Sequence, residues 1–477
     1  MNWKLITKAF KNPDMRKKFA IVLGLIIIYR FLTHVPIPFS DTELIRQSIE
    51  GALEQQQLLG FIDVLTGGAL ASFSIMLMGL GPYINASIIM QILTKIVPSL
   101  KELQQEGESG RTKVNQYTRI LSIPLSIAQS FAMIFVLRQI IQPITGIDIV
   151  ETATIFDWVL MVTSLTAGSV LLMWIGELMS EQGIGNGISL VIFAGIIATL
   201  PSILNSLLPV FAPGQPYTFV ADIPGISTGL GFEFTTQFNL TAIFIVVLFA
   251  IATLISTYVV VKLNEAQRVV KISYAKRIRG NRMYGGVDSV LPIKLIIAGV
   301  IPIIFAVAFL SVPSFVGTLL QNVGTPWIAN LGNQLVEWFA VGGGGLIGGV
   351  PQAQGGTNAV YTVVYFLLVV VFSFFSASLY FNPKEIAENL QKQGGFIAGI
   401  RPGPKTEKYL RQIVNRLTGF GSVALGLIAV LPFIAERITG TQQLTIGGTG
   451  LLIVVAVAIQ SLRQIESKAL MVTYDNE

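Results

Sequence analysis

Long, mainly apolar stretches alternate with shorter charged segments along the whole of this 477-residue chain. A helix that crosses a bilayer needs about 20 consecutive residues of mainly apolar character. Stretches of this length lie at about 19–39, 72–94, 117–141, 153–175, 184–208, 240–262, 293–314, 359–381, 417–436 and 447–465. The pattern therefore predicts an all-α polytopic membrane protein with ten transmembrane helices.

The second stretch is too long for one straight helix. The uncharged run from Val64 to Thr94 has 31 residues. As a helix it would extend roughly 46 Å, against a hydrocarbon core of about 30 Å. Gly67 and Gly68 are the natural place for a break, and non-helical backbone is tolerated at membrane depth only where it is buried in protein or faces water. We therefore predict that this segment borders an internal cavity.

Glycine or proline also interrupts the fifth, seventh and tenth stretches, for example in GIGNGISLVIFAGI and at Pro302. Close packing of helices through small residues is one explanation. A cavity shared by spans 2, 5, 7 and 10 is the other, and the occurrence of breakers in all four favours it. Because spans 2 and 5 occupy the same places in the first five as spans 7 and 10 do in the last five, the pattern indicates two inverted halves of five helices.

Basic residues are sorted to one side of the predicted membrane. With ten spans, 28 of the 32 lysines and arginines fall on the side of the two termini, whereas the acidic residues divide almost evenly, 14 and 12. Cytoplasmic segments of membrane proteins carry such an excess of basic residues. We therefore expect both termini to be cytoplasmic.

Two cytoplasmic loops, 262–292 and 382–416, are both basic and long. A role as topology signals alone is one interpretation. However, the loops also contain aromatic residues, alternating patterns and Gly-Pro turns, which are typical of folded structure. A folded basic surface favours docking of something acidic, such as RNA, an acidic protein face or anionic lipid.

The composition argues against enzyme chemistry. The chain has no cysteine and a single histidine, His34, and the phosphate-loop pattern GxxxxGK[ST] is absent. We therefore predict no catalytic residue, no metal site and no cofactor. Within the spans, Arg30 is expected to extend outward to the membrane surface and His34 to make a local packing contact.

Three functions remain open from the residues alone. The near absence of ionisable residues in the spans favours a passive channel for large, varied substrates, since ion and solute transporters place such groups there. A secondary transporter with inverted repeats is the alternative. An interaction scaffold without a pore is the third possibility.

Several long motifs resemble the SecY family, the central channel subunits of bacterial Sec protein translocases. They occur in order between about Asn12 and Tyr474. They are GGALASFSIMLMGLGPYINASIIMQILT, EGESGRTKVNQYTRI, TAGSVLLMWIGELMSEQGIGNGISLVIFAGI, YAKRIRGNRMYGG with LPIKLIIAGVIPIIFA, FNPKEIAENLQKQGGFIAGIRPGPKT, and GGTGLLIVVAVAIQSLRQIES.

The resemblance implies two halves of five helices around an hourglass pore closed by aliphatic side chains. Matched motif by motif, the pore ring is Leu80, Ile84, Ile188, Ile192, Ile304 and Ile453. It also implies a loosely packed plug, a short helix near 61–70, made of Phe61, Ile62, Leu65, Gly67, Gly68, Ala69 and Leu70. Spans 2 and 3 would part from spans 7 and 8 as a lateral gate through which signal sequences and apolar segments reach lipid.

The resemblance further implies partners: a SecE subunit, a small SecG subunit, the SecA ATPase, the ribosome and nascent polypeptides. The docking residues carried over are Lys276, Arg277, Arg279, Arg282, Lys384, Lys392 and Arg401. The chain departs from the family at Val269 and Asn281, where arginine is usual, and at Ile296, where asparagine is frequent. Packing alone is therefore expected to hold the gate shut.

The predicted location is a bacterial plasma membrane. The expected organisation is an N-terminal segment 1–18, a first half 19–208, an external loop 209–239, a second half 240–465 and a cytoplasmic tail 466–477.

Overall fold

The computed structural model describes most of the chain, in two compact units. The described residues are 13–38, 63, 66–145, 154–211, 251, 254–255, 257–274, 277–279, 282–284, 288–297, 299, 301–321, 325–339, 346–347, 350–351, 359–439, 450 and 453–467. The first unit comprises Met1–Ile255, Ala308–Tyr361 and Pro432–Glu477, and the second comprises Ser256–Val307 and Thr362–Leu431. Each unit is described by itself.

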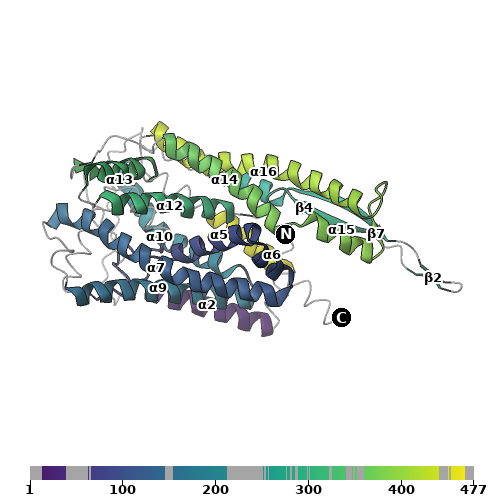
Figure 1. The fold of residues 1–477 in the computed structure, drawn as a ribbon, viewed down its shortest axis with the longest axis horizontal. Helices are drawn as coiled ribbons and strands as arrows, with labels where there is room; N and C mark the ends of the chain where they lie inside the picture. Colours follow the sequence, from purple (N-terminus) through teal and green to yellow (C-terminus); the bar gives the residue numbers. More distant parts are fainter. Residues whose placement is uncertain are drawn as a thin grey trace, which may run out of the picture. The chain divides into compact units, whose positions relative to one another are not determined.

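The first unit consists mainly of helices (Figure 1). They are α2 (Pro13–Leu32), α5 (Gly81–Ile96), α6 (Pro98–Gln105), α7 (Glu108–Thr145), α9 (Ile155–Gln182), α10 (Gly187–Phe211), α13 (Pro326–Phe339) and a helix over residues 453–467. A small hairpin joins β5 (Leu346–Ile347) to β6 (Val350–Pro351). Three further helices contribute residues to both units: α12 (Ile301–Gln321), α14 (Ala359–Tyr380) and α16 (Pro404–Thr439).

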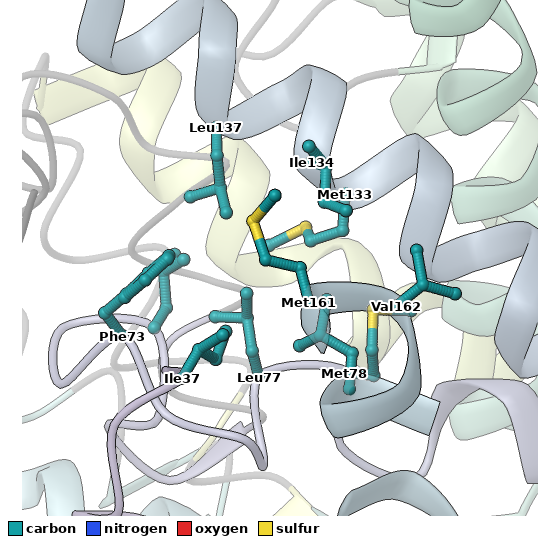
Figure 2. Packing of buried hydrophobic residues seen from close by; sticks show 11 residues of the cluster. Ile37, Phe73, Leu77, Met78, Met133, Ile134, Leu137, Met161 and Val162 are labelled. Atoms are coloured by element: carbon teal, nitrogen blue, oxygen red, sulfur yellow. The ribbon is translucent and has the colours of Figure 1, made fainter. Parts of the chain in front are cut away.

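One core cluster of the first unit lies where α7 and α9 meet the turns that precede α5. Figure 2 shows this cluster, which consists of Ile37, Leu70, Phe73, Leu77, Met78, Met133, Ile134, Leu137, Met161, Val162 and Leu165. Its methionines are unbranched and flexible, so they can fill the irregular space against non-helical backbone. Trp158 on α9 stacks at the edge of the cluster on Phe131 of α7, with ring centroids 5.9 Å apart.

Five described helices are long and apolar enough to cross a membrane: Glu108–Arg138, Ile155–Gln182, Ile301–Gln321, Ala359–Lys392 and Pro404–Ile434. α5 and α6 meet the same criterion only when they are taken together, and they are bent by 103° at Val97. Val97 is extended, and the Pro98 that follows disfavours helical backbone in the residue before it. α2 overlaps predicted span 1, and the helix over 453–467 overlaps predicted span 10.

Two predicted spans begin later than the hydropathy indicated. The helix of the second span starts at Gly81 instead of residue 72, because residues 67–80 form successive turns. The helix of the seventh span starts at Ile301 instead of residue 293, because strand β4 continues to Lys294. Short apolar runs suit a buried strand as well as a helix, so hydropathy alone does not separate the two.

The second unit contains a small antiparallel sheet that joins the two basic loops. Its strands are β1 (Gln267–Tyr274), β4 (Asp288–Lys294) and β7 (Gly395–Phe396), in the order β4-β1-β7. β1 and β4 pair from Gln267↔Lys294 to Ser273↔Asp288, and β7 adds Ser273↔Phe396. A separate hairpin is formed by β2 (Arg277–Arg279) and β3 (Arg282–Tyr284).

The sheet has its own apolar core, so the prediction that both loops are folded is confirmed. The buried residues of this core are Val270, Ile293, Ile397, Leu410, Ile413 and Val414. They come from β1, β4, the turn after β7 and the first turns of α16. Helix α15 (Pro383–Lys392) supplies Ile386, which packs against the same core from the side. Each loop therefore owes part of its structure to the other.

Candidate plug segment, pore ring and docking surface

Residues 66–80, here called the turn segment, interrupt the second predicted span. Gly67, Gly68 and Gly79 have φ angles of 73°, 85° and 54°, and Phe73 has 45°. Positive φ is readily adopted by glycine and disfavoured for residues with a Cβ atom. The predicted break at Gly67-Gly68 is confirmed, and the irregular backbone extends from there to the N-terminus of α5.

Two neighbouring side chains of α2 hold the start of the turn segment. The Tyr29 hydroxyl donates a hydrogen bond to the Thr66 carbonyl over 3.1 Å, and the Arg30 guanidinium donates to the Gly67 carbonyl. Arg30 also donates to the Thr33 hydroxyl. We call Tyr29 and Arg30, with the two carbonyls they bind, the clasp. It satisfies carbonyl groups that the absence of helix leaves without a backbone partner.

Asp63 stabilises the same turns from within the chain. One of its carboxylate oxygens accepts the backbone N–H of Ala71 over 2.9 Å, and its carbonyl accepts the N–H of Gly68. Asp63 precedes the uncharged run and lies outside the predicted spans. Burial raises the pKa of its carboxyl group, while the backbone donors at Ala71 and Leu70 oppose that shift.

Glycine lets this segment pack closely. A Cβ atom built on Gly67 would lie 2.5 Å from the Tyr29 hydroxyl oxygen and 2.9 Å from the Cα atom of Gly195 on α10. Ala69 and Leu70 are completely buried. The expectation of a loosely packed plug is therefore wrong for these residues, because small side chains here allow close approach of backbone. Phe61, Ile62 and Leu65 lie outside the described residues.

α9 and the chain after α2 hold the rest of the turn segment. Gly168 of α9 faces the carbonyl of Ile75, where a Cβ atom would lie only 2.0 Å from the oxygen. The Ser169 hydroxyl donates to the Gly79 carbonyl over 3.2 Å. On the other side, the N–H of Ile37 donates to the carbonyl of Phe73 over 2.9 Å. The segment is thus bound along its whole length.

Arg30 corrects an expectation. The sequence predicts that its side chain extends to the membrane surface, but in the structure the side chain turns to the Gly67 carbonyl. His34 makes a local contact, with Nδ1 3.0 Å from the carbonyl of Arg30. Sequence reasoning missed Tyr29, which is 1% exposed and whose hydroxyl is the second half of the clasp. In the sequence, Tyr29 and Arg30 are adjacent near the end of a span, but no local pattern links them to Thr66 and Gly67.

Five of the six predicted ring residues belong to the first unit. Leu80 is the N-terminal flanking residue of α5, and Ile84 lies one turn further on. Leu80, Ile84, Ile192 and Ile453 are buried, and Ile188 is half-buried. A Cβ atom on Gly185, just before α10, would lie 3.1 Å from the Ser461 hydroxyl of the helix over 453–467, so these two elements are neighbours. Ile304 is half-buried on α12 in the second unit, and the ring as a whole stays a prediction.

The predicted docking residues that are described all lie in the second unit. Arg277, Arg279 and Arg282 are on the β2–β3 hairpin, where Arg279 is the register partner of Arg282. Lys384 and Lys392 are exposed at the two ends of α15. Lys276 lies outside the described residues.

Arg401 sits in an exposed turn between β7 and α16. Its backbone carbonyl accepts the Thr406 hydroxyl over 3.1 Å, and its side chain is exposed. Gly403 closes the turn with a φ of 102° and is itself buried. The preceding residue, Ile400, packs against the sheet core, so the turn that carries the exposed Arg401 side chain is anchored to the folded domain.

These features define the class of protein: a multi-span helical membrane protein with a closely packed irregular segment in its second span and a folded basic domain between later spans. A sequence profile of the SecY family matches residues 74–462. A protein of Streptomyces galbus named protein translocase subunit SecY is 38% identical over 475 residues, which cover 98% of each chain.

Solved structures show the same fold. One described as a protein-conducting channel has a TM-score of 0.59 at 19% identity and covers 94% of this chain and 91% of that one. A second, from work on the plug domain of SecY and the closed state of its channel, has a TM-score of 0.58 at 20% identity, with 94% and 90% covered. A third, Sec61 in a canine ribosome-channel complex, has a TM-score of 0.56 at 18% identity, with 94% and 91% covered.

The chain belongs to the SecY family. It is accordingly a polytopic membrane protein with the ten-helix fold of that family and the protein-conducting channel subunit of a Sec translocase, and it is not an enzyme.

Proposed function

We propose that this subunit passes unfolded secretory polypeptides across the membrane through a pore closed by an aliphatic ring, and that it releases transmembrane segments sideways into lipid. The observation that carries the proposal is the turn segment. It interrupts a span, ends at the proposed ring residue Leu80, one helical turn before Ile84, and is held by hydrogen bonds from α2 and α9. Non-helical backbone of this kind fits a plug beside a pore.

The physical advantage of the ring is its lack of polar atoms. Aliphatic side chains adopt several rotamers, so they can close around a chain of any sequence without binding it, and they exclude ions by dewetting. At the lateral gate, each segment then partitions by its own transfer free energy. A central leucine gains a few tenths of a kcal/mol, whereas an aspartate costs about 3 kcal/mol.

The hydrogen bonds of the clasp stabilise the closed state and must break when the channel opens. When the plug leaves, the Thr66 and Gly67 carbonyls lose their donors and the partly buried guanidinium of Arg30 needs new partners. Hydrogen bonds to charged groups contribute about 1.5 to 3 kcal/mol. A passing polypeptide or a bound partner must therefore supply free energy of this order, which suits a channel that opens only on engagement.

We further propose that the energy comes from SecA or the ribosome, docked on the basic loops, and that SecE and SecG complete the complex in a bacterial plasma membrane with both termini cytoplasmic. Exposed basic side chains on a folded domain support this, because they attract acidic protein faces and RNA. Of these residues, Arg401 follows one that packs on the sheet core, Ile400.

Reconstitution tests the function. The chain is placed in vesicles with SecE, and a precursor with a signal sequence is added with SecA and ATP. We expect the precursor to become resistant to external protease. A functional SecA that hydrolyses ATP without protection of the precursor would overturn the proposal and favour the secondary transporter.

The ring has its own test in the same vesicles. Ile453→Asn places a polar group in the proposed constriction, so we expect a larger ion leak at rest and acceptance of precursors with weakened signal sequences. Ile453→Leu is the matched control, since it keeps the site apolar at equal volume. Equal leak and equal precursor selectivity in both variants would remove Ile453 from the ring.

A further inference from the structure

Helix α13 has a face that neither the fold nor the channel function explains. The helix begins at Pro326, five residues after α12 ends at Gln321, and it lies beside α12 (Figure 1). Its sequence, PWIANLGNQLVEWF, contains two of the five tryptophans of the chain. Both tryptophans are exposed, Trp327 by 67% and Trp338 by 45%.

One sector of α13 packs on the last turns of α12. Gly317 of α12 faces Gly332 of α13, and a Cβ atom on Gly317 would lie 2.9 Å from the Gly332 carbonyl and from side-chain atoms of Leu335 and Val336. A Cβ atom on Gly332 would in turn lie 2.7 Å from the backbone N of Gln321. Such backbone contact through paired glycines fixes α13 at the end of a helix that is long and apolar enough to span the membrane.

The remaining surface of α13 divides into two further sectors. Successive residues of a helix are turned by about 100°, so Trp327, Leu331 and Trp338 fall within about 40° of one another. All three side chains are exposed. The exposed polar residues of α13 fall on the other side of this apolar strip, away from α12, and are Asn330, Gln334 and Glu337.

A helix with three sectors matches one environment in particular. The first sector contacts protein, the second is apolar and rich in tryptophan, and the third is polar. A helix that lies flat at a bilayer surface beside a span needs this arrangement, because it meets protein, acyl chains and water on three sides. Tryptophan is enriched at the same level, where its ring is in the apolar zone and its N–H reaches polar headgroups.

We propose that α13 is an interfacial helix which inserts Trp327, Leu331 and Trp338 into the lipid headgroup region at the Gln321 end of α12. The partner of this surface is the membrane itself. The exposed side of α12 supports the assignment, since Phe309, Val312 and Val316 form an apolar stripe that reaches toward the same end. The proposal does not depend on the ring or the plug.

The absence of cysteine makes a direct test possible, because a single introduced cysteine carries the only label in the chain. Leu331→Cys probes the apolar sector and Asn330→Cys, the neighbouring residue, probes the polar sector. Each variant of the full chain is labelled with a small environment-sensitive fluorophore and reconstituted in phosphatidylglycerol and phosphatidylethanolamine vesicles. Quenching is measured with a lipid that carries a nitroxide near its headgroup, and with iodide in the water.

We expect the Leu331 label to be quenched at least about twofold more by the nitroxide lipid than the Asn330 label, and the order to reverse with iodide, because depth separates the two sectors. Equal iodide quenching at both positions would overturn the proposal by placing the helix in water. Protection of the Leu331 label from both quenchers would also overturn it, since another protein surface would then cover the face.

A second position guards against a variant that fails to fold. Trp338→Cys samples the same sector about two helical turns later and is expected to behave as Leu331→Cys does. In the unlabelled chain, replacement of both Trp327 and Trp338 by Phe should lower the quenching of total tryptophan fluorescence by the nitroxide lipid. An unchanged value would assign that quenching to other tryptophans and contradict the proposal.

Discussion

The turn segment and the β4-β1-β7 sheet are both departures from helix in a helical chain, and they satisfy their backbone groups in different ways. The turn segment lies in the first unit, and side chains and backbone groups of α2, α9 and the chain after α2 bind its carbonyl and N–H groups. The sheet in the second unit pairs its strands with each other. A buried irregular segment therefore depends on individual side chains, whereas the sheet does not.

The two regions also use their basic residues differently. Arg30 turns inward and binds a backbone carbonyl, so its contribution depends on one geometry. Lys384, Lys392 and Arg401 are exposed, and their charges act on whatever approaches. Substitutions in the turn segment should therefore change stability and gating, and substitutions on the sheet surface should change partner binding.

Gly67→Ala is expected to have the largest effect on the free energy of unfolding. With a Cβ atom, the positive φ of residue 67 costs about 1 to 2 kcal/mol, and the Cβ atom also clashes with Tyr29 and with the backbone of Gly195. We therefore expect the free energy of unfolding to fall by about 3 kcal/mol or more. The measurement is the denaturation midpoint of the purified chain in detergent.

Two other glycines separate the cost of the positive φ angle from the cost of the close contact. Gly107 has a φ of 89° and no heavy atom within 4 Å of a built Cβ, so Gly107→Ala should cost only the backbone term, about 1 kcal/mol. Gly24 of α2 has neither constraint, and Gly24→Ala should be neutral or slightly stabilising. A Gly67 variant no worse than the Gly107 variant would show that close packing at the clasp is unimportant.

Arg30→Gln should have the next largest effect, on the closed state of the channel. Loss of a charged donor to the Gly67 carbonyl costs about 2 kcal/mol, which corresponds to about a 30-fold rise in the fraction of open channels. The measurement is the ion conductance of resting complexes in a planar bilayer. Arg119→Gln, which breaks an exposed ion pair with Glu177, is the control and should leave conductance unchanged. Equal conductance in all three proteins would rule out the clasp as part of the seal.

Arg401→Glu is expected to weaken binding of SecA or the ribosome about tenfold, a change of about 1.4 kcal/mol, without a change in resting conductance. Binding to reconstituted complexes by sedimentation measures it. Lys405→Glu makes the same charge change four residues away on an exposed position and should have a smaller effect. A loss of the same size in both variants would mean that net charge, and not the Arg401 turn, determines docking.

Lys384→Gln should change stability least. Its Nζ atom lies 4.0 Å from a carboxylate oxygen of Glu388, and the two side chains are 69% and 54% exposed. Exposed pairs of this spacing contribute about 0.3 to 0.5 kcal/mol. Urea denaturation of the purified protein measures the change. A loss of more than about 1 kcal/mol in the free energy of unfolding would show that this ion pair contributes to stability and not only to the surface charge.

The sequence predicted the helical class, the break at Gly67-Gly68 and the folded loops from physical patterns that are local. Long apolar runs, paired glycines and alternating residues each act within a few neighbours. The clasp could not be predicted in this way, because Tyr29 and Thr66 are 37 residues apart and nothing in either local pattern specifies the other. The hydropathy pattern does not predict the start of α12 at Ile301. The apolar residues just before it belong to β4, which pairs with β1, a strand distant in the sequence.

Packing density was the other feature beyond the reach of composition. Small residues in the turn segment suggest a weakly held plug, yet Gly67 of that segment, with Gly168 of α9 and Gly195 of α10 opposite the segment, permits contacts that a larger side chain would prevent. Whether a small residue loosens or tightens a structure depends on what lies opposite, and only the three-dimensional arrangement supplies that.

The shared sheet has a mechanical consequence. Strand β1 comes from one cytoplasmic loop and β7 from the other, and they are joined by the pairs Ser273↔Phe396 and Tyr274↔Gly395. Strand β4 leads into the first turn of α12 within seven residues. A force applied to either loop is therefore shared by both. Because β4 continues into α12, a force on the sheet also acts on the first turn of α12.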